Sequence, residues 1–159
     1  MARTVLLCWV AVIGLWPAER SFADDRLFDS AYGFLHQAAE ERAFLKTCAD
    51  FDRKNAVSYD HALHLCERAA TQLIERVTNI LNVDFARRGW GANAATRVLA
   101  EIEADATSDV IKMRGEDPDA FLASCRESAY AAAEDAEQLT PEWQRAHHPR
   151  EMRIIDEWR

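Results

Sequence analysis

Glycine and proline are scarce in this chain, with 5 and 4 copies among 159 residues. No stretch rich in serine and glycine separates one part of the chain from another. Because such stretches mark domain boundaries, and because this length suits one domain, we predict a single domain over residues 24–159. No window alternates β-branched and polar residues with period two, so a sheet is not expected.

Sequence motifs that are typical of common enzyme classes are also missing. The chain contains no C-x-x-C, C-x-x-C-H, G-x-S-x-G, H-E-x-x-H, P-loop or Rossmann glycine set, and no Glu-x-x-His pair of the kind that di-iron bundles use. A triad assembled from distant residues is left open by these absences. An enzyme is nevertheless the least favoured of the function classes considered, and no cofactor is expected.

Basic residues are outnumbered, with 19 Lys and Arg against 27 Asp and Glu and a formal net charge of −8. Nucleic-acid binding starts from a basic face that displaces counterions from phosphates, and no run of lysine or arginine offers one. The expected partner is therefore another protein, and nucleic acid is excluded.

A long hydrophobic run is absent, but a short one stands near the start. Val5 to Trp16 is uniformly apolar for 12 residues, follows Arg3, and leads to a Ser21-Phe22-Ala23 site with small residues where a signal peptidase reads. A membrane-spanning helix needs about 20 apolar residues. We therefore predict a signal peptide over residues 1–23, export to a periplasmic or extracellular location, no membrane span after cleavage, and loss of Cys8 with the peptide.

Apolar residues in the rest of the chain recur at spacings of three and four, which is typical of amphipathic helices. The spacing predicts helices over about 25–52, from a Ser58 N-cap to about 86, from about 93 to 115, and over about 118–138. Arg42 interrupts the first apolar stripe. The predicted core stripes consist of Phe28, Ala31, Leu35, Ala38, Leu45 and Cys48; Ala62, Cys66, Ala69, Leu73, Val77 and Ile80; Ala95, Leu99, Ile102, Ala106, Val110 and Met113; and Leu122, Cys125, Ala129, Ala132 and Ala136.

Glycine and proline mark the expected ends and starts of these helices. Gly89 is placed to end the second helix in a left-handed turn, and Gly115 is expected to end the third. Asp117-Pro118 and Thr140-Pro141 each combine an N-cap with proline at the first helical position. Short connections make neighbours antiparallel, so the predicted fold is an all-α antiparallel bundle of about four main helices plus a short C-terminal helical segment.

Three cysteines remain after cleavage: Cys48, Cys66 and Cys125. In an oxidising compartment two of them are expected to pair. We rank Cys48 with Cys66 first, because both lie near the connection between the first two helices, and keep Cys125 as an alternative partner for either. The third cysteine is expected to be buried and inert.

His61 and His64 stand three residues apart, a spacing that lets two imidazoles ligate one metal ion from a single helix. A third ligand would have to come from His36 or a remote carboxylate. The alternative is that both are solvated surface residues, which is the commoner role of such pairs.

Glu101, Asp105 and Asp109 stand four residues apart on the third predicted helix. Like charges at this spacing oppose the helix by about 0.2–0.5 kcal/mol per pair, and a basic partner or a cation would relieve that repulsion. Trp90, between Gly89 and Gly91, is either a packing residue or a binding contact. The first hypothesis is therefore a nonenzymatic exported adaptor, inhibitor or envelope chaperone; the second is a metal or small-ligand carrier that uses His61 and His64.

Overall fold

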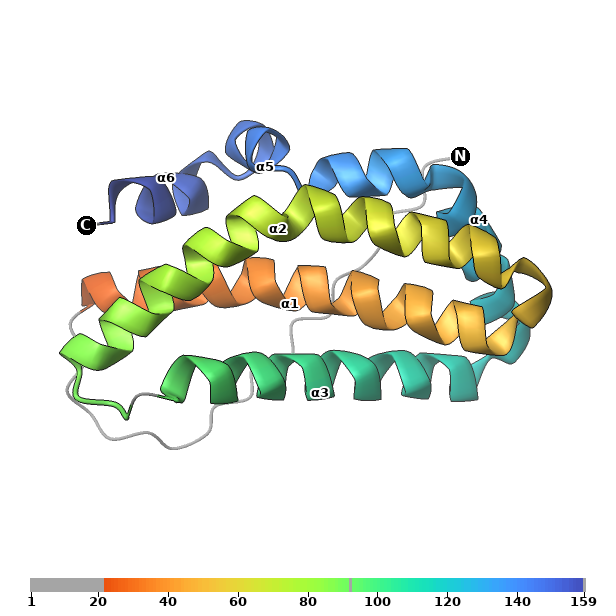
Figure 1. The fold of residues 1–159 in the computed structure, drawn as a ribbon, viewed down its shortest axis with the longest axis horizontal. Helices are drawn as coiled ribbons and strands as arrows, with labels where there is room; N and C mark the ends of the chain where they lie inside the picture. The colour runs from red at the N-terminus through yellow and green to blue at the C-terminus, as the bar shows by residue number, and fades with distance from the viewer. Residues whose placement is uncertain (1–21, 92, 159) are drawn as a thin grey trace.

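The computed structural model describes residues 22–91 and 93–158, and all its regular elements are helices (Figure 1). The predicted all-α bundle is thus confirmed. The predicted signal peptide lies almost entirely outside the described residues and stays a prediction; cleavage after Ala23 would remove the first two residues of α1. The helices are α1 (Phe22–Phe51), α2 (Ala56–Arg87), α3 (Ala94–Glu116), α4 (Pro118–Gln138), α5 (Pro141–His147) and α6 (Pro149–Glu157), with a 3₁₀ turn η1 (Arg53–Asn55) between the first two.

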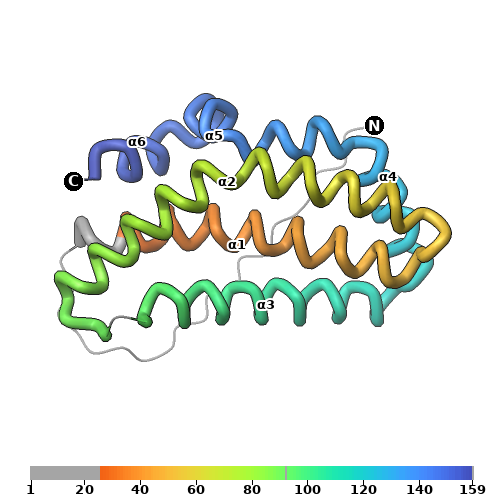
Figure 2. The backbone as a smooth tube through the Cα atoms, in the orientation of Figure 1, coloured from red at the N-terminus to blue at the C-terminus, as the bar shows by residue number. Residues whose placement is uncertain are grey.

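Successive long helices run in opposite directions along the molecule, as the tube in Figure 2 shows. α1 lies in the middle and packs against both α2 and α3, and α4 packs against α2 (Figure 1). The central position of α1 follows from its sequence, since its buried residues occupy more than one side of the helix. No helix in the described ranges is long and apolar enough to cross a membrane.

The fourth leg of the bundle is built from three helices in succession. α2 has 32 residues and α4 has 21, so at 1.5 Å per residue α4 is about 16 Å shorter than its neighbour. α5 and α6 continue beyond the end of α4, and α6 packs on α1 near the far end of the molecule (Figure 1). The short C-terminal segment therefore completes the core.

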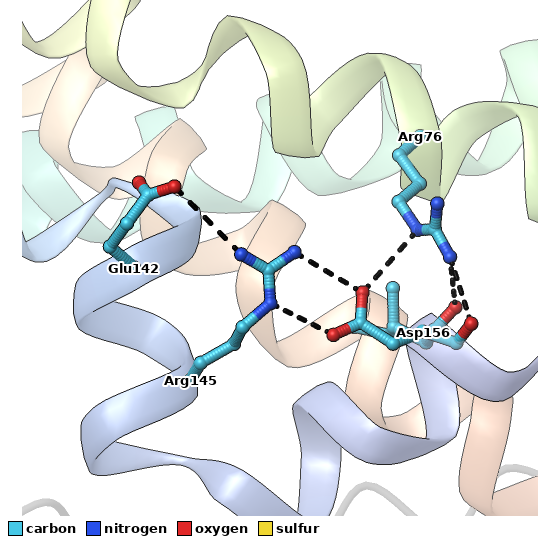
Figure 3. Close-up of polar contacts among 5 residues, drawn as sticks. Arg76, Glu142, Arg145 and Asp156 are labelled. Atoms are coloured by element: carbon cyan, nitrogen blue, oxygen red, sulfur yellow. Dashed lines mark hydrogen bonds and ion pairs between the residues drawn. The ribbon is translucent and has the colours of Figure 1, made fainter.

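An ionic network holds α5 and α6 against α2 (Figure 3). Arg145 donates to both carboxylate oxygens of Asp156, from Nε at 2.9 Å and from Nη2 at 3.3 Å. Arg76 of α2 donates to the backbone carbonyls of Ile155 and Asp156, both at 3.1 Å, and its Nε lies 3.7 Å from the Asp156 carboxylate. The Arg145 hydrogen bond also lowers the pKa of Asp156.

The core confirms most of the predicted stripes. Met113 is the clear exception, because its side chain is exposed. Phe28, Ala69, Leu99, Leu122 and Ala129 are partly buried at the margin of the core. The fully buried stripe residues are Ala31, Leu35, Ala38, Leu45, Cys48, Ala62, Cys66, Leu73, Val77, Ile80, Ala95, Ile102, Ala106, Val110, Cys125, Ala132 and Ala136.

The structure confirms two of the predicted helix caps and corrects two other predicted helix ends. The Asp117 side chain accepts from Ala120 N at 3.0 Å and that of Thr140 from Trp143 N at 3.3 Å, so both predicted N-caps are confirmed. Ser58 as an N-cap is wrong, because η1 leads directly into α2 at Ala56. Gly115 as the end of α3 is also wrong; the helix continues to Glu116.

Gly89 ends α2 as predicted, with φ of 71°. Its N–H donates to the Ala86 carbonyl at 3.1 Å, and the N–H of Trp90 donates to the Phe85 carbonyl at 2.9 Å. These two bonds are the 5→2 and 6→1 pair of a Schellman motif, which satisfies two carbonyls that the end of the helix leaves open.

Candidate functional site

The disulfide joins Cys48 of α1 to Cys125 of α4, and Cys66 is buried and free. The first-ranked pairing of Cys48 with Cys66 is therefore wrong, and the alternative with Cys125 is the one observed. Cys48 lies 3 residues before the end of α1, whereas Cys66 lies 10 residues after the start of α2. At 1.5 Å per residue this difference separates the two thiols by about 10 Å along the bundle.

Cys66 lies instead at the level of Glu41, which stands 10 residues before the end of α1. Glu41 of α1, Cys66 of α2 and Asp135 of α4 form a polar cluster in which the thiol is buried and the two carboxyls are partly buried. Burial, reinforced by Asp135 and Glu40, raises the pKa of Glu41 to about 7. Burial, reinforced by Glu41 and Asp135, raises the pKa of Cys66 to about 12, so the thiol is held protonated.

Glu41 is a site residue that the sequence analysis missed. Its Oε1 is buried and accepts no hydrogen bond within the described part of the chain. A signal was present: Phe34, Ala38, Glu41, Leu45 and Cys48 follow one another at spacings of four and three. Glu41 thus occupies a core position of the first helix.

His61 and His64 lie on the exposed side of α2. His64 Nδ1 is 3.6 Å from Glu67 of its own helix, and the structure does not bring His36 to either residue. Among the described residues, one group of three potential metal ligands converges: His36, Glu40 and Asp109, whose ligand atoms lie within 4.8 Å of one another. The histidine that sequence reasoning kept as an auxiliary ligand is therefore the one in a cluster.

Glu101, Asp105 and Asp109 are all exposed on α3, as predicted. Within the described ranges, none of the three forms an ion pair with lysine or arginine. They lie next to α1, because Asp109 approaches Glu40 and His36, while Asp105 and Glu101 add to the burial that raises the pKa of Tyr32. We call Glu40, Glu101, Asp105 and Asp109 the acidic face.

Tyr32 and His36 border this face on α1. Their rings stack with centroids 5.8 Å apart, and His36 Nδ1 lies 3.5 Å from Glu40. The face therefore combines carboxylates from two helices with a tyrosine and a histidine.

Arg42, the residue that interrupts the first stripe, links three helices. Its Nη1 donates to Glu103 of α3 at 2.6 Å, and its Nε lies 3.9 Å from Glu67 of α2. The Nε atom is buried and makes no hydrogen bond to any described residue. The interruption of the stripe thus marks a polar contact between helices.

A cavity of about 180 Å³ lies beside this contact, between α1, α2 and α3. We call it the Arg42 cavity. Arg42 and Glu103 supply its polar wall. Its apolar wall consists of Leu35, Ala38, Ala39, Ile74, Leu99 and Ile102.

Trp90 is partly buried and packs against the core. Its ring stacks on Phe85 with centroids 4.7 Å apart and planes inclined by 24°. A hydrophobic contact between these two positions commonly accompanies a Schellman motif. The structure favours the packing interpretation of Trp90 over a presented binding contact.

No family model, curated protein or solved structure matches this chain.

Proposed function

We propose that this protein is an exported, nonenzymatic binding protein that uses its acidic face to hold a basic segment of another protein. The observation that carries the proposal is the convergence of carboxylates from α1 and α3 on one exposed surface. The formal charge of −8 acts in the same direction, since it attracts a basic partner over long range. The disulfide between Cys48 and Cys125 supports an exported location.

Relief of the repulsion between carboxylates of the acidic face would contribute to the free energy of binding a basic partner. Glu101, Asp105 and Asp109 repel one another along α3, and Glu40 adds a fourth carboxylate beside Asp109. A lysine or arginine placed among them relieves this repulsion and gains charge-assisted hydrogen bonds. Tyr32 and His36 add ring surface against which the stem of a basic side chain can pack.

Charge reversal on the acidic face tests this function. The protein without residues 1–23 is immobilised and used to capture proteins from an envelope extract, and the captured proteins are identified. Glu101→Lys, Asp105→Lys and Asp109→Lys are combined in one variant. We expect the captured basic proteins to be lost.

A matched variant changes Asp119, Glu127 and Glu137 to lysine. All three are exposed on α4, so the net charge changes by the same amount on another surface. This control is expected to retain capture. Equal capture by both variants would show that the acidic face is not the binding surface.

Cation binding is a second candidate, favoured by the convergence of His36, Glu40 and Asp109. One imidazole and two carboxylates form a mixed donor set that suits a divalent transition metal. Equilibrium dialysis with zinc tests it. Zinc binding is expected to be lost in His36→Ala and retained in the His61→Ala, His64→Ala double variant. The reverse result would indicate that His61 and His64 are the ligands instead.

A further inference from the structure

The Arg42 cavity lies between α1, α2 and α3, and none of its lining residues belongs to the acidic face. Its volume of about 180 Å³ is comparable with apolar cavities of about 150 Å³ that stay dry and bind benzene. Its walls come from three helices, with leucine, isoleucine and alanine side chains as the main lining. A compact apolar molecule would restore the van der Waals contacts that these side chains lack.

One end of the cavity reaches the surface. The Arg42 side chain is 29% exposed and that of Glu103 is 59% exposed, so their ion pair lies where the cavity meets solvent. A ligand in the cavity would lie against Leu35, Ile74 and Ile102 and beside the guanidinium.

The guanidinium has donors to spare. Arginine carries five N–H groups, of which one donates to Glu103, and the buried Nε has no hydrogen-bond partner among the described residues. Leaving a buried donor without an acceptor is unfavourable, and Arg42 lines the cavity, so an acceptor placed there is favoured.

The charges around Arg42 exclude an anion as that acceptor. Glu103 already pairs with the guanidinium, Glu67 lies 3.9 Å from Nε, and the whole chain is negative. A carboxylate ligand would have to displace one of these side chains and enter against like charge. A neutral oxygen meets neither obstacle.

We propose that the Arg42 cavity binds a small uncharged apolar molecule with one carbonyl oxygen, which accepts a hydrogen bond from the Arg42 guanidinium. This activity is independent of the acidic face. It assigns ligand carriage to the cavity between α1, α2 and α3 and leaves protein binding to the acidic face.

Three probes of nearly the same shape test the ligand class: acetophenone, cumene and benzoate. Each is titrated into the full-length protein labelled at leucine and isoleucine methyl groups. We expect saturable shifts at Leu35, Ile74, Leu99 and Ile102, with acetophenone bound about tenfold more tightly than cumene, in line with a hydrogen bond to a charged donor. Benzoate is expected to bind most weakly.

Two pairs of variants locate the interaction. Arg42→Met should bind cumene while losing the preference for acetophenone, whereas Arg114→Met, at an arginine outside the cavity, should keep it. Ala39→Leu should fill the cavity and abolish all binding, whereas Ala104→Leu, which adds the same group on the exposed side of α3, should not.

The wild-type titration decides the proposal even where a variant fails to fold. Absence of saturable shifts at the four lining residues would overturn the site. Equal affinity for acetophenone and cumene, or tighter binding of benzoate, would overturn the assigned ligand class.

Discussion

Trp90 lies over Phe85 because Gly89 turns the chain back on the end of α2. The rings stack at a centroid distance of 4.7 Å, and the Trp90 N–H returns to the carbonyl of Phe85. The left-handed φ of 71° at Gly89 makes both contacts possible.

Gly89→Ala is expected to lower the free energy of unfolding by about 1 kcal/mol, because a Cβ disfavours left-handed backbone. A Cβ at this position would meet no atom within 4 Å, so the cost is conformational. Gly115→Ala is the control: it lies in open space within α3 and should stabilise by about 0.5–1 kcal/mol. Urea denaturation measures both, and equal effects would contradict the turn.

The Cys48–Cys125 bond should be visible by peptide mapping. Trypsin without reductant should release one species joining residues 47–53 to residues 115–126, with Cys66 in a separate peptide. A linked peptide that contains Cys66 would contradict the observed pairing. In the folded protein at pH 8, iodoacetamide should leave Cys66 unmodified, because the thiol is buried and its pKa is about 12.

Loss of the disulfide should be costly. It closes a loop across a sequence separation of 77, which corresponds to roughly 4 kcal/mol by loop entropy. Cys48→Ala with Cys125→Ala is therefore expected to lower the unfolding free energy by a few kcal/mol. Cys66→Ala, which removes a buried thiol but no bond, should cost clearly less.

Stability should fall as pH rises through the titration of Glu41. Its pKa is raised from 4.5 to about 7 on folding, so the folded state retains a proton that the unfolded state releases. The contribution of Glu41 to the free energy of unfolding is fully present below pH 4.5. It is lost as the pH rises to about 7, and the loss is about 3 kcal/mol at most. Unfolding free energies between pH 5 and 8 should show this fall.

Glu41→Gln should remove much of that pH dependence, because the amide does not ionise. Glu40→Gln, at the adjacent exposed carboxylate, should retain most of it. The residual slope in Glu41→Gln is expected from Asp135, whose pKa is also raised by burial. Superimposable profiles for Glu41→Gln and the wild type would contradict the buried position of this carboxyl.

Asp156→Asn should loosen α6. The change removes the charge that faces Arg145 and Arg76, with an expected cost of about 1 kcal/mol. Native-state hydrogen exchange should become faster at Met152 and Ile155. Glu142→Gln affects a longer and more exposed contact with Arg145, at 3.8 Å, and should leave that exchange nearly unchanged.

Helix periodicity was enough to predict the bundle, because apolar spacing reports burial directly. Pairing between helices required more, because it depends on where each helix begins. Cys48 and Cys66 lie at unequal distances from the connection between α1 and α2. A start of α2 at Ser58 rather than Ala56 makes this difference look smaller than it is, so the predicted pairing of the two is wrong. An error of a few residues in depth decides which side chains meet.

The polar interior was harder to read for a different reason. Arg42 interrupts a core stripe and Glu41 occupies a core position, but the partners of each lie on other helices. Likewise, the approach of Asp109 to His36 and Glu40 arises from the packing of α3 on α1. No spacing within one helix contains that information.

The bond between Cys48 and Cys125 encloses α2 and α3 within one covalent ring. A protease that cuts the exposed glycines between these two helices would therefore leave both fragments attached. Such a nicked molecule would migrate as a single species until a reductant is added.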